Sequence, residues 1–197
     1  MLDPQILRSL VWTDYRLAVL FLVSFPLVLL IWAAYKRNGA IQHLLTIYWK
    51  VASLLMITVY LMIGGFSISF VSAVMARILI PISLWFWVDL NEEIREQPDS
   101  AIKLTFNSWR WAVTLYCIIG TAISLTYLPC AFSSARLASA ECQTWLEAPL
   151  LYKEFLHANY TNGFLGFFGI VGLIIYMLTL AWFVFVRLGK QGRQAIN

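Results

Sequence analysis

Long apolar runs alternate with short polar stretches along the whole chain. Residues Leu17 to Tyr35 include no charged side chain, and further predominantly apolar runs of similar length follow. A helix needs about 20 apolar residues to cross a bilayer. The pattern therefore predicts an all-α, polytopic membrane protein that forms one helical domain over residues 1–197. Its five transmembrane helices are expected at about 17–35, 43–64, 66–88, 109–128 and 163–186.

The longest apolar tract, Val51 to Val88, admits two interpretations. In the first, Gly64 and Gly65 make a tight turn between two spans. In the second, residues Val51–Ala76 form one long tilted helix, and residues 78–88 lie on the membrane surface. The second interpretation leaves only four spans, so the two differ in the side on which the chain ends.

Basic residues favour five spans and give the orientation. Cytoplasmic segments of membrane proteins carry an excess of Lys and Arg. Five spans with a lumenal or periplasmic N-terminus put nine basic residues on the cytoplasmic side and four on the other. Four spans would place Arg187–Arg193 opposite Lys36 and Arg37. We therefore predict a cytoplasmic C-terminus, a cytoplasmic loop at 89–108 and a lumenal loop at 129–162.

The composition agrees with lipid as the main solvent. Hydrophobic residues make up 61% of the chain and charged residues 12%, whereas soluble domains carry about 25% charged residues. The net charge is +4 and no basic run is present, so nucleic acid is not expected as a partner. Four charged residues precede the first apolar run, which indicates a retained helix rather than a signal peptide.

Arg77 is the only charge between Val51 and Val88. An arginine at membrane depth is costly and usually has a partner or a function. The predicted spans contain no acidic residue, so an ion pair requires an end residue, such as Asp14 or Asp89, to reach inward. Without one, an ion pair or a proton relay is not expected.

Three interpretations of Arg77 remain open. The side chain donates to backbone carbonyls freed by Pro81 and to the hydroxyls of Ser69, Ser72 or Ser83. Alternatively, it binds an anion, a lipid headgroup, a cofactor carbonyl or a larger complex. In the third interpretation, this segment does not lie at membrane depth.

Four acidic residues follow Arg77 at helical spacing, namely Asp89, Glu92, Glu93 and Glu96. Residues spaced i, i+3, i+4 and i+7 share one helix face. Such a face can hold a divalent ion, but it is more often solvated. We predict no metal site here, and expect at most a cytoplasmic acidic contact, since a mechanism with two carboxylate clusters lacks its second cluster.

Cys130 and Cys142 both fall in the predicted lumenal loop, while Cys117 lies within a predicted span. A compartment outside the cytoplasm is oxidising, so we predict a disulfide between Cys130 and Cys142, with two free thiols as the alternative. The spacing is not typical of zinc sites. The two histidines, His43 and His157, lie near helix ends, which excludes a bis-histidine haem but leaves a single chlorophyll ligand open.

Glycines recur at every third position early in the last predicted helix, at Gly163, Gly166, Gly169 and Gly172. Small residues let helices approach closely. We expect this ridge to pack against another helix of the chain, and a partner's helix or a flat pigment is the alternative.

Three segments carry a resemblance to a known family. They are Arg77–Ile94, which is the most specific, Val11–Arg16 and Ser108–Val113. Together they resemble a cyanobacterial integral-membrane family catalogued only as a domain of unknown function. The resemblance implies an oxygenic phototroph, a thylakoid membrane and a role around photosynthetic complexes. It supplies no catalytic residues.

The leading hypothesis is a non-catalytic accessory subunit or assembly factor of a thylakoid photosynthetic complex, with a photosystem as the expected partner. It requires no cofactor, although chlorophyll, carotenoid or bound lipid are left open as ligands. The alternative is a small transporter or channel in which Arg77 lines an anion path. A third hypothesis is a metal-dependent lipid or quinone enzyme that uses the carboxylates between Asp89 and Glu96.

Overall fold

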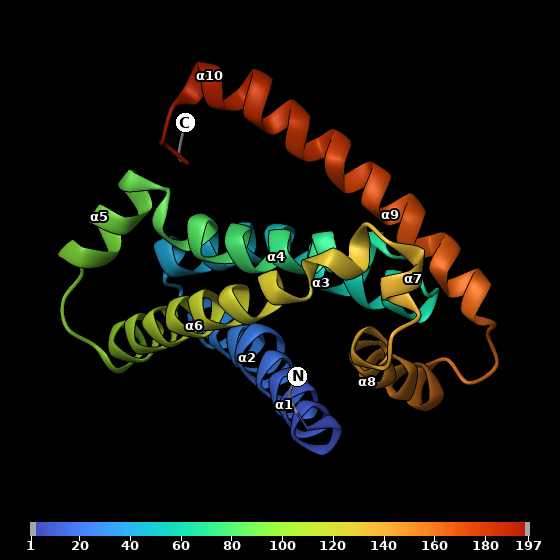
Figure 1. Cartoon of the computed structure of the whole chain (residues 1–197). Coiled ribbons are helices and arrows are strands. Elements are labelled where there is room, and N and C mark those ends of the chain that lie inside the picture. Colours follow the sequence, from blue (N-terminus) through green and yellow to red (C-terminus); the bar gives the residue numbers. More distant parts are fainter. Residues whose placement is uncertain (1–2, 196–197) are drawn as a thin grey trace.

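The structure, a computed structural model, describes residues 3–195 and is all-α in that range (Figure 1). Four of the described helices have the length and apolar character needed to cross a membrane. They are Pro4–Tyr35, Gly39–Ile63, Ile68–Trp85 and Asn162–Lys190. The chain is therefore an integral membrane protein, as its pattern predicted. A fifth long helix, Ala101–Thr126, is less apolar and is not one of the four.

The first helix begins at Pro4, well before the predicted residue 17. It consists of α1 (Pro4–Ala18), a π-helical segment (Val19–Ser24) and α2 (Phe25–Tyr35). Asp3 caps its start by accepting a hydrogen bond from the Gln5 amide at 2.8 Å, and proline is favoured at the first helical position. The early start places Asp14 inside a helix rather than in a polar tail.

The π-helical segment exposes backbone carbonyls that two other helices use. Trp109 Nε1 donates to the Phe21 carbonyl at 2.9 Å, and the Tyr48 hydroxyl donates to the Leu22 carbonyl at 2.7 Å. Pro26, which has no N–H, leaves the Leu22 carbonyl without its usual helical donor. These bonds fix the first helix against α3 and α6.

The tract from Val51 to Val88 folds as two helices, so its interpretation as one long helix is wrong. Helix α3 (Gly39–Ile63) ends at the predicted glycine turn, where Gly65 adopts a positive φ of 70°, and α4 (Ile68–Trp85) returns beside it. The hydroxyls of Thr58 and Ser72 lie 2.8 Å apart across this hairpin.

The predicted cytoplasmic loop is largely helical. It contains α5 (Val88–Glu96) and the first two turns of α6 (Ala101–Thr126), which begins earlier than predicted because Ser100 caps it. Helix α6 packs along α4 (Figure 1). The main core lies between α2, α3, α4, α5 and α6 and includes the fully buried side chains of Leu44, Leu45, Tyr48, Leu84 and Phe106.

The predicted lumenal loop is also structured. It contains a 3₁₀ turn (Leu128–Ala131), α7 (Ser134–Leu137) and α8 (Ala140–Leu156), and α8 packs against α1 and α3. A disulfide joins Cys130 to Cys142, whose Cα atoms are 6.1 Å apart. The bridge holds the start of α8 at the end of α6.

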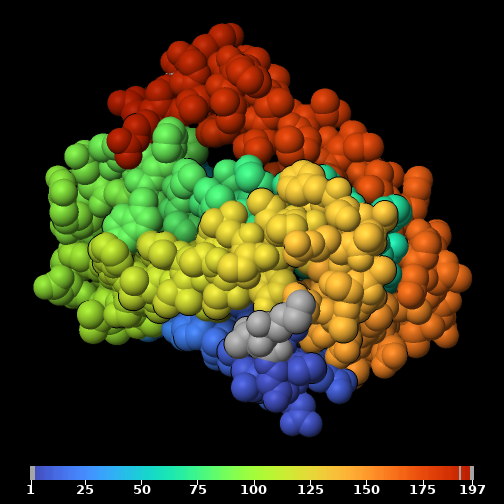
Figure 2. All heavy atoms as spheres, viewed as in Figure 1, coloured from blue at the N-terminus to red at the C-terminus, as the bar shows by residue number. Residues whose placement is uncertain are grey.

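The last helix lies along one edge of the molecule. It consists of α9 (Asn162–Trp182), a second π-helical segment (Phe183–Arg187) and α10 (Leu188–Gln191). Figure 1 shows α9 crossing the bundle obliquely, and Figure 2 shows it at the edge opposite the N-terminal helix. Beyond α10 the chain returns to α5, where the Ala195 amide donates to the Asp89 carboxylate at 2.7 Å.

Candidate functional site

Arg77 and Asp14 form an ion pair between α4 and α1. Their side chains are 11% and 22% exposed, so both charges lie largely inside the protein. The expectation that Arg77 has no acidic partner is therefore wrong. Asp14, one of the two end residues that could reach inward, is its partner. The longer first helix explains the difference, because it begins at Pro4 and places Asp14 on a helix, beside α4 and α6.

Helix α6 completes this pair from a third direction. The Tyr116 hydroxyl donates to the Asp14 carboxylate at 2.8 Å, and the Arg77 guanidinium carbon lies 5.6 Å from the centre of the Tyr116 ring. A Cβ atom on Gly120 would lie 1.7 Å from Arg77 NH1. The guanidinium can therefore lie against α6 only because Gly120 has no side chain.

None of the serine hydroxyls proposed as partners of Arg77 bonds to it, and the Ser69 hydroxyl is buried without a hydrogen-bond partner. Ser72 interacts with Thr58 and with the Ser69 carbonyl, and Ser83 donates to the Ile80 carbonyl at 2.7 Å. The only hydrogen bond found from the Arg77 guanidinium to a residue within 3–195 goes to Asp14. The interpretation that serines satisfy Arg77 is therefore wrong.

The ion pair lies in the wall of an apolar cavity of about 280 Å³. The cavity is lined by α1, the first π-helical segment, α3, α4, the end of α6 and α8, and it is partly open to the surroundings. Typical small-molecule pockets measure about 300–1,000 Å³, so this space suits one hydrocarbon chain better than a whole tetrapyrrole. Its apolar lining includes Val11, Val19, Val23, Leu55, Val59 and Phe70.

A few polar groups interrupt this lining besides Arg77 and Asp14. Tyr152 reaches the cavity from α8, and burial raises the pKa of its hydroxyl above the ordinary value for tyrosine. The group therefore stays protonated and can donate a hydrogen bond. An apolar wall with an ion pair and neutral hydroxyls can hold a lipid-like molecule with one polar end.

The carboxylates of α5 do not come together. Asp89 accepts from the Ala195 amide, and Glu92 lies 3.8 Å from Arg95 in an exposed pair. Within residues 3–195, no group of three His, Cys, Asp or Glu side chains is placed to hold a metal ion. The structure thus gives these residues contacts to the C-terminal tail and to solvent.

The glycine ridge of α9 is occupied within the chain. A Cβ on Gly166 would lie 2.8 Å from the Gly64 Cα, and one on Gly169 would lie 2.8 Å from the Leu61 amide nitrogen. Gly172 lies against Ile57, while Gly163 has open space. Gly166, Gly169 and Gly172 therefore pack on α3 and the turn that follows it, as expected, and only Gly163 is left open to a contact from outside the chain.

The two histidines take no part in the cavity. His157 follows α8 and lies 3.3 Å from the Tyr60 hydroxyl through Nε2, and His43 is exposed early in α3. Both lie near helix ends, as predicted.

Arg110, one of the nine basic residues expected on the cytoplasmic side, is a second buried cation. It lies on α6 and is 9% exposed. No carboxylate of the described residues pairs with it. Arg110 is the second residue of the predicted span at 109–128, and this position could have identified it as a buried cation.

Comparison with known protein families gives one match. The family described as "Protein of unknown function (DUF3177)" matches residues 8–196, which is nearly the whole chain. No match was found among curated proteins or among solved structures.

Proposed function

The chain belongs to the DUF3177 family, and we propose that it is a non-catalytic accessory subunit or assembly factor of a photosynthetic membrane complex in the thylakoid. In this role it binds membrane subunits of the complex laterally, with a photosystem as the expected partner. The observation that carries the proposal is the exposed apolar surface of α9.

Helix α9 contributes little to the core of its own chain. In its most apolar window 11% of the residues are buried, compared with 39% in α3 and 44% in α4. Its glycine side contacts α3, and the remaining surface presents large side chains. The exposed set includes Phe164, Phe167, Phe168, Ile174, Ile175, Met177, Leu178 and Trp182.

Aromatic residues and methionine are enriched where proteins meet partners, and this surface carries both. The aromatic ring of Phe168 contacts the rings of Phe164 and Phe167 on this surface. The surface is therefore proposed to bind a partner helix, in place of the glycine ridge.

The proposal includes five spans with a lumenal N-terminus. Helix α6 is 26 residues long and packs beside α4, which supports its crossing the membrane as the fifth span. This topology places the disulfide of Cys130 and Cys142 on the oxidising side. It also places α5 and the basic tail in the cytoplasm.

A transporter with Arg77 on an anion path is a weaker proposal. Asp14 neutralises Arg77, and Gly120 and Tyr116 hold the guanidinium against α6. The cavity beside the pair instead supports a bound lipid or carotenoid-like chain as a structural ligand.

Affinity purification from gently solubilised membranes tests the main proposal. The tag belongs on the N-terminus, because Arg193 and Ala195 bond to Phe86 and Asp89. We expect photosystem or cytochrome subunits to copurify. A triple variant on α9, Met177→Ala, Leu178→Ala and Trp182→Ala, is expected to lose them.

A matched triple variant on the exposed face of α2, Leu27→Ala, Val28→Ala and Ile31→Ala, serves as the control and is expected to keep them. A protein that purifies alone, or α9 and α2 variants that behave alike, would contradict the proposal.

A further inference from the structure

Arg110 is a buried cation that other side chains hold but do not neutralise. Its guanidinium donates to the Asn91 side-chain oxygen and, at 3.1 Å, to that of Asn107. The guanidinium carbon lies 3.9 Å from the centre of the Trp85 ring. Its Nε is buried without a hydrogen-bond partner. A buried charge normally requires a counter-charge. The Arg110 guanidinium has none among the described residues, so an anion bound beside it would stabilise it.

The amide of Asn91 is oriented by its surroundings. Its nitrogen donates to the carbonyls of Leu84 at 3.3 Å and Trp87 at 2.6 Å, which leaves the oxygen to accept from Arg110. The Trp85 indole is likewise fixed, since its Nε1 donates to Thr114 at 2.9 Å. The guanidinium is therefore held in one orientation before any ligand binds, which lowers the cost of binding.

Arg110 opens into a groove of about 570 Å³ between α5 and α6. The groove is also lined by two basic residues, Arg95 and Lys103, and by one acidic residue, Glu92. Each of these charges has a partner: Arg95 lies near Glu92, and Lys103 lies 3.2 Å from Asp99. The groove thus keeps one uncompensated positive charge among the described residues, at Arg110.

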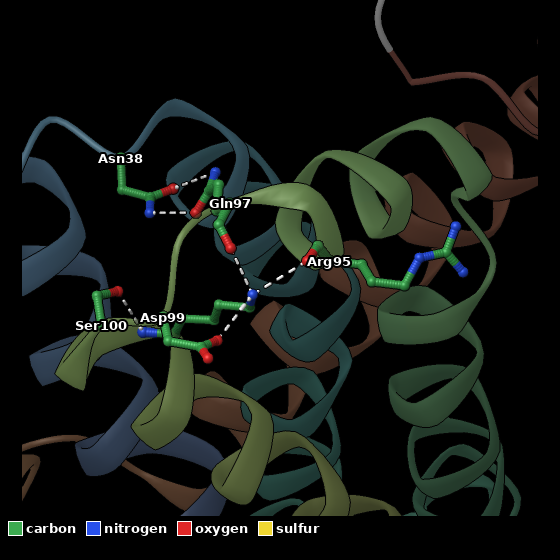
Figure 3. Close-up of polar contacts among 6 residues, drawn as sticks. Asn38, Arg95, Gln97, Asp99 and Ser100 are labelled. Carbon is green, nitrogen blue, oxygen red and sulfur yellow. Dashed lines mark hydrogen bonds and ion pairs between the residues drawn. The ribbon is translucent and has the colours of Figure 1, made fainter.

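The Lys103 ammonium is committed to the end of α5. It donates to the carbonyls of Arg95 and Gln97 as well as to Asp99, as the dashed lines in Figure 3 show. Paired side-chain amides of Asn38 and Gln97 close the other side of this turn. Lys103 therefore shapes the rim of the groove, and Arg110 supplies the free donors.

An apolar stripe on α6 leads away from the groove. Leu104, Trp111, Leu115 and Ile118 are each more than half exposed and recur at helical spacing. In Figure 2 this helix faces the viewer and no other element covers it. The Trp111 ring lies 4.7 Å from the Trp85 ring at the groove, and tryptophan favours the level of lipid headgroups.

We propose that this groove binds the phosphate or sulfonate headgroup of an anionic lipid, whose acyl chains lie along the α6 stripe. The headgroup oxygens accept from the N–H groups of the two terminal guanidinium nitrogens that Asn91 and Asn107 leave unused, and Trp111 lies at the glycerol level. Basic pockets at the cytoplasmic ends of transmembrane helices recognise such headgroups. The site does not involve α9, but it rests on the proposed topology, in which α6 crosses the membrane and begins on the cytoplasmic side.

Native mass spectrometry of the full chain in mild detergent, with phosphatidylglycerol or phosphatidylcholine added at equal concentration, tests this site. We expect one phosphatidylglycerol to be retained about tenfold better than phosphatidylcholine, because both phosphates can accept from Arg110 but the choline ammonium cancels the net charge of phosphatidylcholine. Arg110→Gln removes the donors and should abolish the preference. Lys36→Gln removes one exposed charge outside the groove and should keep it.

A second variant, Asn107→Asp, tests the same site if Arg110→Gln does not fold. It gives Arg110 a carboxylate in the chain, so the lipid-free protein should be at least as stable as the native one and should lose the lipid preference. Retention of the preference in Asn107→Asp, or equal retention of both lipids by the native chain, would overturn the proposal. Inorganic phosphate at millimolar concentration should not displace the lipid, and displacement would show that the groove takes a free anion instead.

Discussion

Arg77 and Asp14 lie sixty-three residues apart in the chain and meet as an ion pair between α4 and α1. The pair joins the first and third long helices, and Tyr116 on α6 joins a further helix to it. A lone intramembrane charge thus becomes part of a neutral cluster. Its role is to hold three helices at one level beside the apolar cavity.

Tyr116→Phe removes the hydroxyl that donates to Asp14 at 2.8 Å. We expect the free energy of unfolding to fall by about 1.5–3 kcal/mol, the usual range for a hydrogen bond to a charged group. Unfolding in mixed micelles measures the change. Tyr35→Phe, at a residue 82% exposed, is the control and should be neutral. Equal effects of the two changes would contradict the assigned contact.

Gly120→Ala places a methyl group where Arg77 NH1 lies, 1.7 Å from the new atom. The guanidinium must move, and overpacking of this kind costs about 1–3 kcal/mol. Gly163→Ala adds the same group where no atom lies within 4 Å and should be neutral or slightly stabilising. A Gly120→Ala protein as stable as the native chain would show that Arg77 does not rest on α6.

Gly169→Ala is expected to loosen α9 from α3, because its Cβ would lie 2.8 Å from the Leu61 nitrogen. The purified protein should lose about 1–3 kcal/mol of stability, whereas Gly189→Ala, which has open space, should not. If the ridge bound a partner instead, Gly169→Ala would leave the isolated protein unchanged and weaken only copurification.

The disulfide predicts how many alkylating groups the protein takes up, a number that mass spectrometry measures. The unfolded, unreduced protein should take up one alkylating group at Cys117, and the reduced protein should take up three. Reduction should also destabilise the segment around α7 and α8 by about 3 kcal/mol, given the short loop closed by the bridge. Three groups without reduction would mean that Cys130 and Cys142 are free.

The apolar pattern predicted the helices and the glycine turn because both depend on local composition. It placed the first helix too late, since the charges at Asp14 and Arg16 were assigned to the membrane surface. The Asp3-Pro4 capping signal, which marks the true start, was the missed cue. Helix α8 was missed as a helix because its apolar residues lie among charged ones.

Tertiary contacts explain the remaining differences. The partner of Arg77 comes from a distant helix, and no local spacing in the sequence brings Asp14 to it. Arg110 was counted only among the basic residues of the predicted cytoplasmic side, yet Trp85 of α4 and Asn91 of α5 cover its guanidinium in the folded protein. The glycine ridge was read correctly as a packing surface, but the sequence could not show that α3 occupies it.

The central claim is that Arg77 organises the bundle through Asp14. A double-mutant cycle with Arg77→Leu, Asp14→Leu and the combined variant tests it most directly. Each single change leaves one buried charge unpaired and should cost about 3–5 kcal/mol. The double variant should cost much less than their sum, with a coupling energy of about 2 kcal/mol or more. Additive losses, or an Arg77→Leu protein as stable as the native one, would contradict the claim.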